Sequence, residues 1–251
     1  MVQAVRNRMA ARRACCAVAA LCLLLTASAR AADLTLTTED FSPPFNMIDV
    51  RSQTLVGISV EKLVELMKRA HLGYTFKVFP WARAYQMALQ LPDTCVFSTT
   101  RTPAREALFT WIGPLTYNDW MLFARADEPR KPASLDEVGQ RTIGGYRDDS
   151  TGDYLRQRGY RVDVAAVDAN NPQKLLSGRI DFWATGELSG RYLIAKDDMV
   201  GKIVPLFKFN HAELYLACNL ATGAALAKNL NQILKDMDRD GTNAAIDRKY
   251  R

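Results

Sequence analysis

Segments with the patterns of strands and of helices alternate along most of this chain. Between residues 33 and 97, three short strand-like runs are separated by two stretches whose apolar residues recur at helical spacing. The alternation restarts after a polar, proline-bearing stretch at 126–138, with strand-like runs at 141–146, 160–167 and 179–185. This alternation predicts an α/β fold with mostly parallel sheets covered by helices, and its restart predicts two lobes.

The first 31 residues have the pattern of an export signal. A cluster of arginines precedes an apolar run at 14–27 that is too short to span a bilayer, and the small residues Ala29 and Ala31 mark a cleavage site. A membrane anchor is the competing hypothesis. No later apolar run is long enough to span a membrane, so we expect a soluble protein in the periplasm, cleaved near Ala31.

Removing this segment changes the charge balance. Five of the 33 basic residues and none of the 27 acidic residues lie in it, which leaves 28 basic and 27 acidic residues. A chain so close to neutral gives no electrostatic reason to expect a nucleic-acid partner.

Cysteine and histidine are scarce in the remaining chain. Three of the five cysteines lie in the export signal, which leaves Cys95 and Cys218 as a disulfide or as two buried free thiols. His71 and His211 are the only histidines, and no cysteine spacing is typical of a metal site. The sequence therefore predicts no metal and no cofactor.

Hydroxyls and arginines follow the strand-like run that ends at Phe97. Thr102 followed by Pro103 predicts a helix start, whose free N–H groups favour an anion. A guanidinium can bind a carboxylate with two hydrogen bonds. One hypothesis is a carboxylate clamp made of Ser98, Thr100 and Arg105; the other is an ordinary capped helix with solvated arginines.

A similar junction occurs in the second half of the chain. Residues 143–155 run from a strand through a polar turn into a helix, with Asp149 or Ser150 as the N-cap. Ligands of open α/β sheets bind beyond the carboxyl ends of strands. Two such junctions, one in each lobe, predict a site for a small anion between two helix N-termini.

From Asp33 onward, the chain resembles the family 3 periplasmic solute-binding proteins, the polar amino-acid receptors of ABC importers. The resemblance lies in three segments, TRTPAREALFTW (100–111), SGRIDFWATGELSGRYLIAK (177–196) and ILKDMDRDGTNAAIDRKY (233–250). It implies a bilobed periplasmic-binding-protein fold of type II. Lobe 1 would comprise 32–121 and 217–251, lobe 2 would comprise 122–216, and hinge strands near 120–125 and 214–218 would join them.

The resemblance also implies a set of ligand-binding residues. Arg105 matches the family's carboxylate-binding arginine, Thr100 and Ser98 help to hold the same group, and Asp149 and Ser150 close onto it from lobe 2. The remaining residues are an aromatic wall, an acidic position near the ligand's amine, and two residues of the lobe 1 rim: Phe41, Glu39, Trp81 and Arg83. A packing role is the alternative for Trp81. Cys95 and Cys218 would lie on neighbouring strands, where a disulfide could form.

One position departs from the family's pattern. The aspartate that usually binds the α-amino group should fall five residues after Asp181, and that residue is Gly186. Either the neighbouring Glu187 or Glu39 binds the ammonium, or the ligand has no α-amino group.

Residues 236–247 resemble an EF-hand calcium loop, with acidic residues at loop positions one, three, five and twelve and Gly241 at position six. Asp247 in place of glutamate at position twelve, and Ala244 at position nine, weaken this hypothesis. The interpretation that we favour is a helix end capped by Gly241.

The function implied by the resemblance is capture of a small carboxylate-bearing solute by a monomeric receptor that presents it to a membrane permease. Two alternatives stay open. One is a periplasmic enzyme on the same scaffold, similar to cyclohexadienyl dehydratases, with Glu187 as its general acid. The other is an accessory protein of a periplasmic dehydrogenase. A sensor ectodomain is not expected, because no second membrane segment follows before Arg251.

Overall fold

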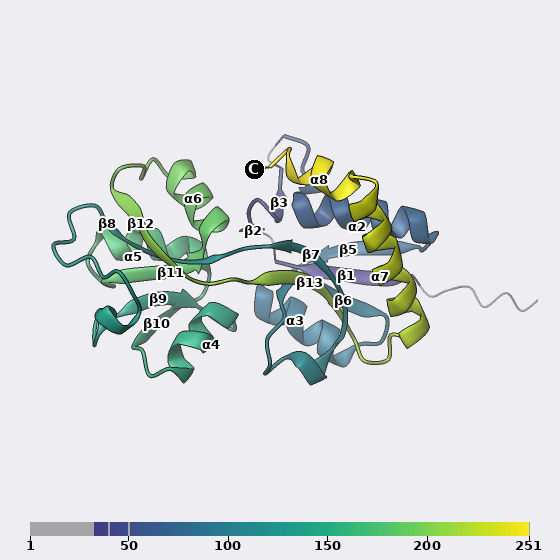
Figure 1. Ribbon diagram of the computed structural model, residues 1–251, viewed down its shortest axis with the longest axis horizontal. Helices are drawn as coiled ribbons and strands as arrows, with labels where there is room; N and C mark the ends of the chain where they lie inside the picture. Colours follow the sequence, from purple (N-terminus) through teal and green to yellow (C-terminus); the bar gives the residue numbers. More distant parts are fainter. Residues whose placement is uncertain (1–32, 40, 50, 251) are drawn as a thin grey trace, which may run out of the picture. The chain divides into compact units, whose positions relative to one another are not determined.

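The computed structural model describes residues 33–250 except 40 and 50, and it confirms the predicted α/β class (Figure 1). The first lobe is built on a five-stranded sheet in which β1 lies between the parallel strands β5 and β6. The remaining two strands are antiparallel to their neighbours. In sheet order the strands are β5 (Tyr74–Val78), β1 (Leu34–Thr38), β6 (Thr94–Thr100), β13 (Glu213–Cys218) and β7 (Thr110–Tyr117).

Helices cover both faces of this sheet. On one face, α2 (Ile58–Ala70) and α7 (Ala224–Arg239) bury Leu63 and Leu230 against strand residues such as Phe97. On the other face, α3 (Trp81–Gln90) packs Ala84 and other apolar residues onto the sheet. The apolar spacing in the sequence therefore marks the helix surfaces that form this core.

A small three-stranded sheet lies beside the start of α2. Its strands are β2 (Phe41–Ser42), β3 (Asn46–Ile48) and β4 (Leu55–Val56). Gly57, the N-cap of α2, has φ 132°, and a Cβ at this residue would lie 2.4 Å from the carbonyl oxygen of Phe45. Only glycine fits this turn.

The second lobe has its own five-stranded sheet. In it, β8 runs antiparallel to both of its neighbours, β11 and β12. Alternate residues of β8 point to opposite faces: Phe123 packs in a core with α5 and α6, and Leu122 in a core with α4. In sheet order the strands are β10 (Val162–Ala165), β9 (Ile143–Tyr146), β11 (Phe182–Gly186), β8 (Trp120–Arg125) and β12 (Ile203–Asn210). The helices are α4 (Ser150–Gln157), α5 (Asn171–Leu176) and α6 (Glu187–Lys196).

The chain passes between the two sheets twice, between β7 and β8 and between β12 and β13 (Figure 1). The strands change sheet within residues 118–119 and 211–212, a few residues before the predicted lobe limits at 121/122 and 216/217. Trp120 and Met121 thus pair in the second sheet, and residues 213–216 pair in the first. The division into functional lobes stays a prediction.

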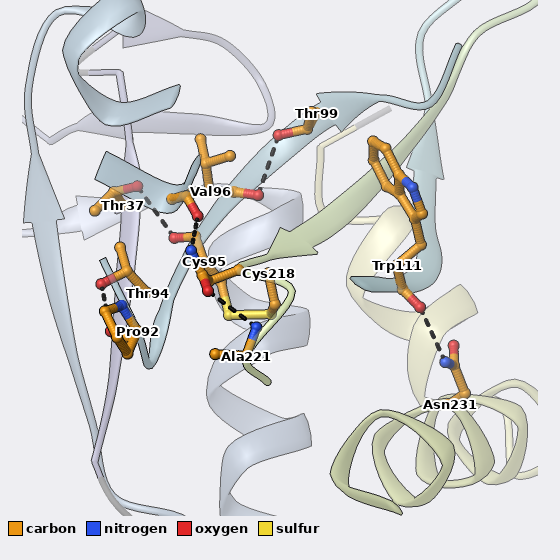
Figure 2. The surroundings of a disulfide bond; sticks show 12 residues. Thr37, Pro92, Thr94, Cys95, Val96, Thr99, Trp111, Cys218, Ala221 and Asn231 are labelled. Atoms are coloured by element: carbon orange, nitrogen blue, oxygen red, sulfur yellow. Dashed lines mark hydrogen bonds between the residues drawn. A yellow bond between two sulfur atoms is a disulfide. The ribbon is translucent and has the colours of Figure 1, made fainter. Parts of the chain in front are cut away.

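A disulfide joins Cys95 of β6 to Cys218 of β13 (Figure 2). The two residues are directly opposite one another in the antiparallel pairing, and both are fully buried. Of the two states that the sequence left open, the structure contains the bonded one. The bond attaches the returning strand β13 to the sheet formed by the first part of the chain.

The prediction of a helix after Thr102 was wrong. Residues 103–105 form a turn, followed by a single 3-10 turn, η2 (Glu106–Leu108). The reason is the pairing of β7 with β13: Phe109 already has an extended backbone, and the pairing begins at Thr110 opposite Cys218, so the helical turn ends at Leu108. Arg105 therefore does not lie in a helical turn.

The segment that resembles an EF-hand forms the junction between α7 and α8 (Thr242–Asp247). Gly241 adopts the left-handed conformation, one residue beyond the C-cap Asp240, as expected for a helix end. Its acidic side chains bind protein donors: Asp240 accepts from Thr242 and Arg69, and Asp238 accepts from Asn243.

The predicted export signal lies outside the described residues. Over the part of the chain that the structure describes, none of the helices combines the length and the apolarity needed to cross a membrane. In that same part, no three histidine, cysteine or acidic side chains converge as metal ligands would.

Candidate ligand-binding site

A cavity of about 60 Å³ lies where strands of both sheets end. From the first lobe it is lined by the end of β6 and the turn that follows, and from the second by the segments after β9 and β11. Seven of the predicted ligand-binding residues line it: Ser98, Thr100, Arg105, Glu39, Trp81, Asp149 and Ser150. These residues are far apart in the sequence and line one space at the ends of strands. Their role in binding stays a prediction.

Arg105 crosses from one lobe to the other. Its guanidinium donates from Nη2 to the carbonyl oxygen of Asp148 at 2.9 Å and from Nη1 to that of Thr100 at 3.4 Å. The residue is 8% exposed, and its guanidinium lies 5.0 Å from the centroid of the Tyr85 ring. Because its hydrogen bonds go to two neutral carbonyls, this guanidinium retains the capacity to bind an anion.

Two hydroxyls of β6 stand beside Arg105. Ser98 has φ 56°, an unusual conformation for a serine in a strand, and its Oγ is 3.0 Å from the Oγ of Ser59. Together with Thr100, Ser98 gives the first-lobe wall of the cavity a polar, hydrogen-bonding surface.

Asp149 is the N-cap of α4, and it is one of the two residues that the sequence predicted for this position. Its Oδ2 accepts from the backbone N–H groups of Thr151 at 2.9 Å and Gly152 at 3.2 Å. Burial, together with the nearby charge of Asp168, raises the pKa of Asp149 to about 6, against the opposing effect of Arg105 and of the N–H donors. The carboxylate is therefore close to its protonation midpoint under mildly acidic conditions.

Asp168, at the start of η4 (Asp168–Asn170), is an acidic cavity residue that the sequence analysis missed. Its Oδ1 accepts from Trp183 Nε1 at 2.8 Å and Asn171 Nδ2 at 3.0 Å, and its Oδ2 accepts from Thr185 Oγ1 at 2.5 Å. Burial raises the pKa of Asp168, although these three hydrogen bonds favour the ionised form. A weak signal was available, because Asp168 follows the end of β10.

Asn118 was also missed. It lies between β7 and β8, where the chain passes from the first sheet to the second, and it lines the cavity. Its Nδ2 is 3.5 Å from Ser189 Oγ, and its Oδ1 is buried with no hydrogen-bond partner among the described residues. Nothing in the local sequence distinguishes it from an ordinary turn asparagine.

Three predicted residues do not contribute a described side chain to the cavity. Glu187 is ion-paired with Arg191 on the exposed surface of α6, and Arg83 lies over the ring of Phe79 at 4.3 Å; neither lines the cavity. The backbone of Phe41 lies in β2, but its side chain is outside the described part of the structure. Their roles in binding stay predictions.

A second cavity of about 530 Å³ adjoins the first. The two share Thr100, Arg105, Trp120 and Ser150 as lining residues, so Arg105 stands between them. Tyr85 and Tyr154 add aromatic surface to the larger cavity. A solute too large for the smaller cavity would extend into the second.

The model of the bacterial extracellular solute-binding proteins, family 3, matches residues 34–251. A search of the curated proteins finds no match.

Several solved structures are similar to this chain. One is a histidine kinase sensor domain with similarity to periplasmic binding proteins, with TM-score 0.81 and 20% identity over 88% of this chain and 97% of that one. A second is an arginine transport system periplasmic binding protein from Legionella pneumophila, with TM-score 0.76 and 19% identity over 88% and 100%. A third is the arginine-, lysine-, histidine-binding protein of Geobacillus stearothermophilus, with TM-score 0.76 and 17% identity over 87% and 95%. At these identities the likeness shows the fold, which is the predicted bilobed fold of type II.

Proposed function

The chain belongs to the bacterial extracellular solute-binding proteins of family 3, and from this premise we propose that it binds a small carboxylate-bearing solute between its lobes. The solute is an amino acid or a related compound. The protein is exported to the periplasm, acts as a monomer and delivers the solute to the permease of an ABC importer.

The observation that carries this proposal is the position of Arg105. Its guanidinium lines the cavity, is almost fully buried, and donates hydrogen bonds to the backbone carbonyls of Thr100 and Asp148. A carboxylate placed there gains charge-assisted hydrogen bonds in a site shielded from water. Hydroxyls of Ser98 and Thr100 are available to the same group.

The amino-acid class has two further supports. Among the described residues that line the cavity, Glu39, Asp149 and Asp168 are acidic and Arg105 is basic, which favours a solute that also carries a positive charge. Of the similar structures, one is described as an arginine transport system periplasmic binding protein and another as an arginine-, lysine-, histidine-binding protein.

A catalytic role has no comparable support. The proposed general acid of the enzyme hypothesis, Glu187, pairs with Arg191 at 2.9 Å outside the cavity. A general acid has to reach the reacting group within hydrogen-bonding distance. We therefore favour binding without turnover, and a prephenate-like acid incubated with the protein should remain unchanged.

The test is thermal melting of refolded, ligand-stripped mature protein with a panel of amino acids, diamines, dicarboxylates and aromatic acids. A ligand at about 100 times its Kd stabilises by about 2.7 kcal/mol, enough to raise the melting temperature by several degrees. We expect one solute class to do so, and Arg105→Ala to abolish the shift. Arg239→Ala is the matched control, because Arg239 pairs with Asp236 on the exposed surface and lines neither cavity. If no compound of the panel raises the melting temperature, the proposal is contradicted.

A further inference from the structure

Asn118 fills the space that a side chain at position 186 would need. Gly186 ends β11 with an ordinary extended backbone, so its conformation does not require glycine. A Cβ at this residue would lie 1.9 Å from Asn118 Nδ2 and 2.3 Å from the other amide atoms. An acidic side chain therefore cannot be accommodated at position 186 unless Asn118 moves away.

Asp168 supplies a carboxylate over the end of the same strand. Two of its three hydrogen-bond donors, Trp183 and Thr185, belong to β11, the strand that Gly186 ends. The third, Asn171, belongs to α5. These bonds fix the position of the carboxylate, and Asp168 lines the cavity. The acidic group that position 186 lacks is thus present, but it comes from a different segment of the chain.

The surroundings of Asp168 favour a cation. The acidic residues Asp149 and Glu39 line the same cavity, and Arg105 is the basic residue among its lining side chains. Asp149 already accepts two N–H bonds at the start of α4. The buried Oδ1 of Asn118, unpaired among the described residues, is a further acceptor at the cavity wall. Carboxylates and an amide oxygen around a space of about 60 Å³ suit a small group with several hydrogen-bond donors, such as an ammonium group.

We propose that Asp168 binds a primary ammonium group of the solute, in the place where the family's pattern would put a residue at position 186. This inference rests on the proposed function and narrows it: the solute carries both a carboxylate, bound at Arg105, and an ammonium group, bound at Asp168. Asn118 and Gly186 shape this end of the cavity, and Glu187 does not take part.

The test compares paired ligands by calorimetry at pH 7.5. Each L-amino acid that raises the melting temperature is measured beside the carboxylic acid of the same carbon skeleton without the amine. Wild-type protein should bind the amine-bearing member at least about 10-fold more tightly. Asp168→Asn, which keeps the shape and the acceptor for Trp183, should lose about 10- to 100-fold in affinity for that member, as expected when a charge-assisted hydrogen bond is removed. Its affinity for the deaminated acid should change little.

Asp163→Asn is the matched control, because it removes a carboxylate of the same lobe that pairs with Lys174 and does not line the cavity. It should bind both ligands as the wild type does. Equal affinities of wild type for the paired ligands, or an undiminished preference in Asp168→Asn, would overturn the assignment while leaving a carboxylate receptor intact. Failure of the wild type to bind either member of any pair would overturn the proposed function and the assignment together.

Discussion

The carbonyl oxygen of Asp148 accepts hydrogen bonds from Arg105 Nη2 at 2.9 Å and from Trp81 Nε1 at 3.1 Å. Both donors belong to the first lobe and the acceptor to the second, so this single oxygen connects the two lobes at the edge of the cavity. Asp148 has φ 58°, a conformation that turns the chain sharply just before α4. A solute that bridges the lobes favours their closed arrangement through contacts that exist only there, and we expect the two hydrogen bonds to the Asp148 carbonyl to be among those contacts.

Trp81→Phe should therefore weaken solute binding without destabilising the first lobe. The substitution retains an aromatic ring and removes the N–H donor to Asp148. A neutral hydrogen bond contributes about 0.5–1.5 kcal/mol, so we expect affinity to fall about 2- to 10-fold by calorimetry. Trp111→Phe is the control, because Trp111 Nε1 donates to the Glu106 carbonyl at 3.0 Å within one lobe. Equal losses in both variants would contradict a role for the contact between lobes.

Asp149 should make stability depend on pH in the range of about 4 to 6. Its pKa is raised to about 6 by burial and by Asp168, so the folded protein holds this proton more tightly than the unfolded chain does. Its unfavourable contribution is fully present above pH 6 and disappears as the pH falls toward 4. Asp149→Asn keeps an N-cap acceptor and removes the charge. We expect the variant to be more stable than wild type at pH 7.5, by at most about 3 kcal/mol, and equally stable at pH 4.

Urea unfolding at several pH values measures this difference. Asp153→Asn on the same helix is the control, because Asp153 is exposed and pairs with Arg156. It should leave the pH profile of the free energy of unfolding unchanged. Parallel pH profiles of the free energy of unfolding for wild type and Asp149→Asn would contradict a raised pKa of Asp149 in the folded protein.

The alternation of apolar and polar residues was sufficient to predict most of the elements. Helices such as α2 and α7 bury one surface, and that periodicity is local and visible in the sequence. The prediction of a helix after Thr102 was wrong although Thr102 and Pro103 form a good helix start. The pairing of Thr110 with Cys218, which is distant in sequence, overrides that local preference. Local preferences do not contain such long-range pairings.

The candidate site was predictable where it follows strand ends in lobe 1 and at α4, and less so elsewhere. Asp168 becomes part of the cavity only because Trp183 and Thr185 of another strand hold its carboxylate there. Gly186 was recognised as a departure from the family's pattern, but its meaning depends on Asn118, 68 positions earlier in the chain. Both relationships arise from tertiary packing and leave no pattern in the neighbouring residues.

Loss of the disulfide between Cys95 and Cys218 should destabilise the protein considerably. The bond closes a loop with a sequence separation of 123 residues, and restricting the unfolded chain over such a loop stabilises by about 3–5 kcal/mol on the loop-entropy model. We expect Cys95→Ala/Cys218→Ala to melt about 6–20 °C below wild type. A mass about 2 Da below that of the reduced chain, measured without reductant, would confirm that the bond is present in the wild type. Equal melting temperatures would contradict its stabilising role.

Lys62 of α2 and Asp247 of α8 form an ion pair that is largely buried. Lys62 Nζ lies 2.9 Å from Asp247 Oδ1 and donates to the Leu115 carbonyl at 2.7 Å; its side chain is 3% exposed, whereas that of Asp247 is 28% exposed. Asp247→Asn leaves a buried ammonium without its counter-charge, which should cost about 2–4 kcal/mol in the free energy of unfolding. Lys62→Met should cost less, because the Asp247 side chain that it leaves behind is partly exposed to water, although its Oδ1 is buried.

The double variant Lys62→Met/Asp247→Asn separates the pair from the packing around it. Because the neutral asparagine no longer faces a buried charge, the double variant should be more stable than Asp247→Asn alone. Asp236→Asn is the control, since Asp236 pairs with Arg239 on the exposed surface and should change stability by less than about 0.5 kcal/mol. Additive losses in the double variant would contradict the coupling. The same pairing commits Asp247, position twelve of the segment that resembles a calcium loop, to Lys62, so we expect neither calcium nor a chelator to shift the melting temperature.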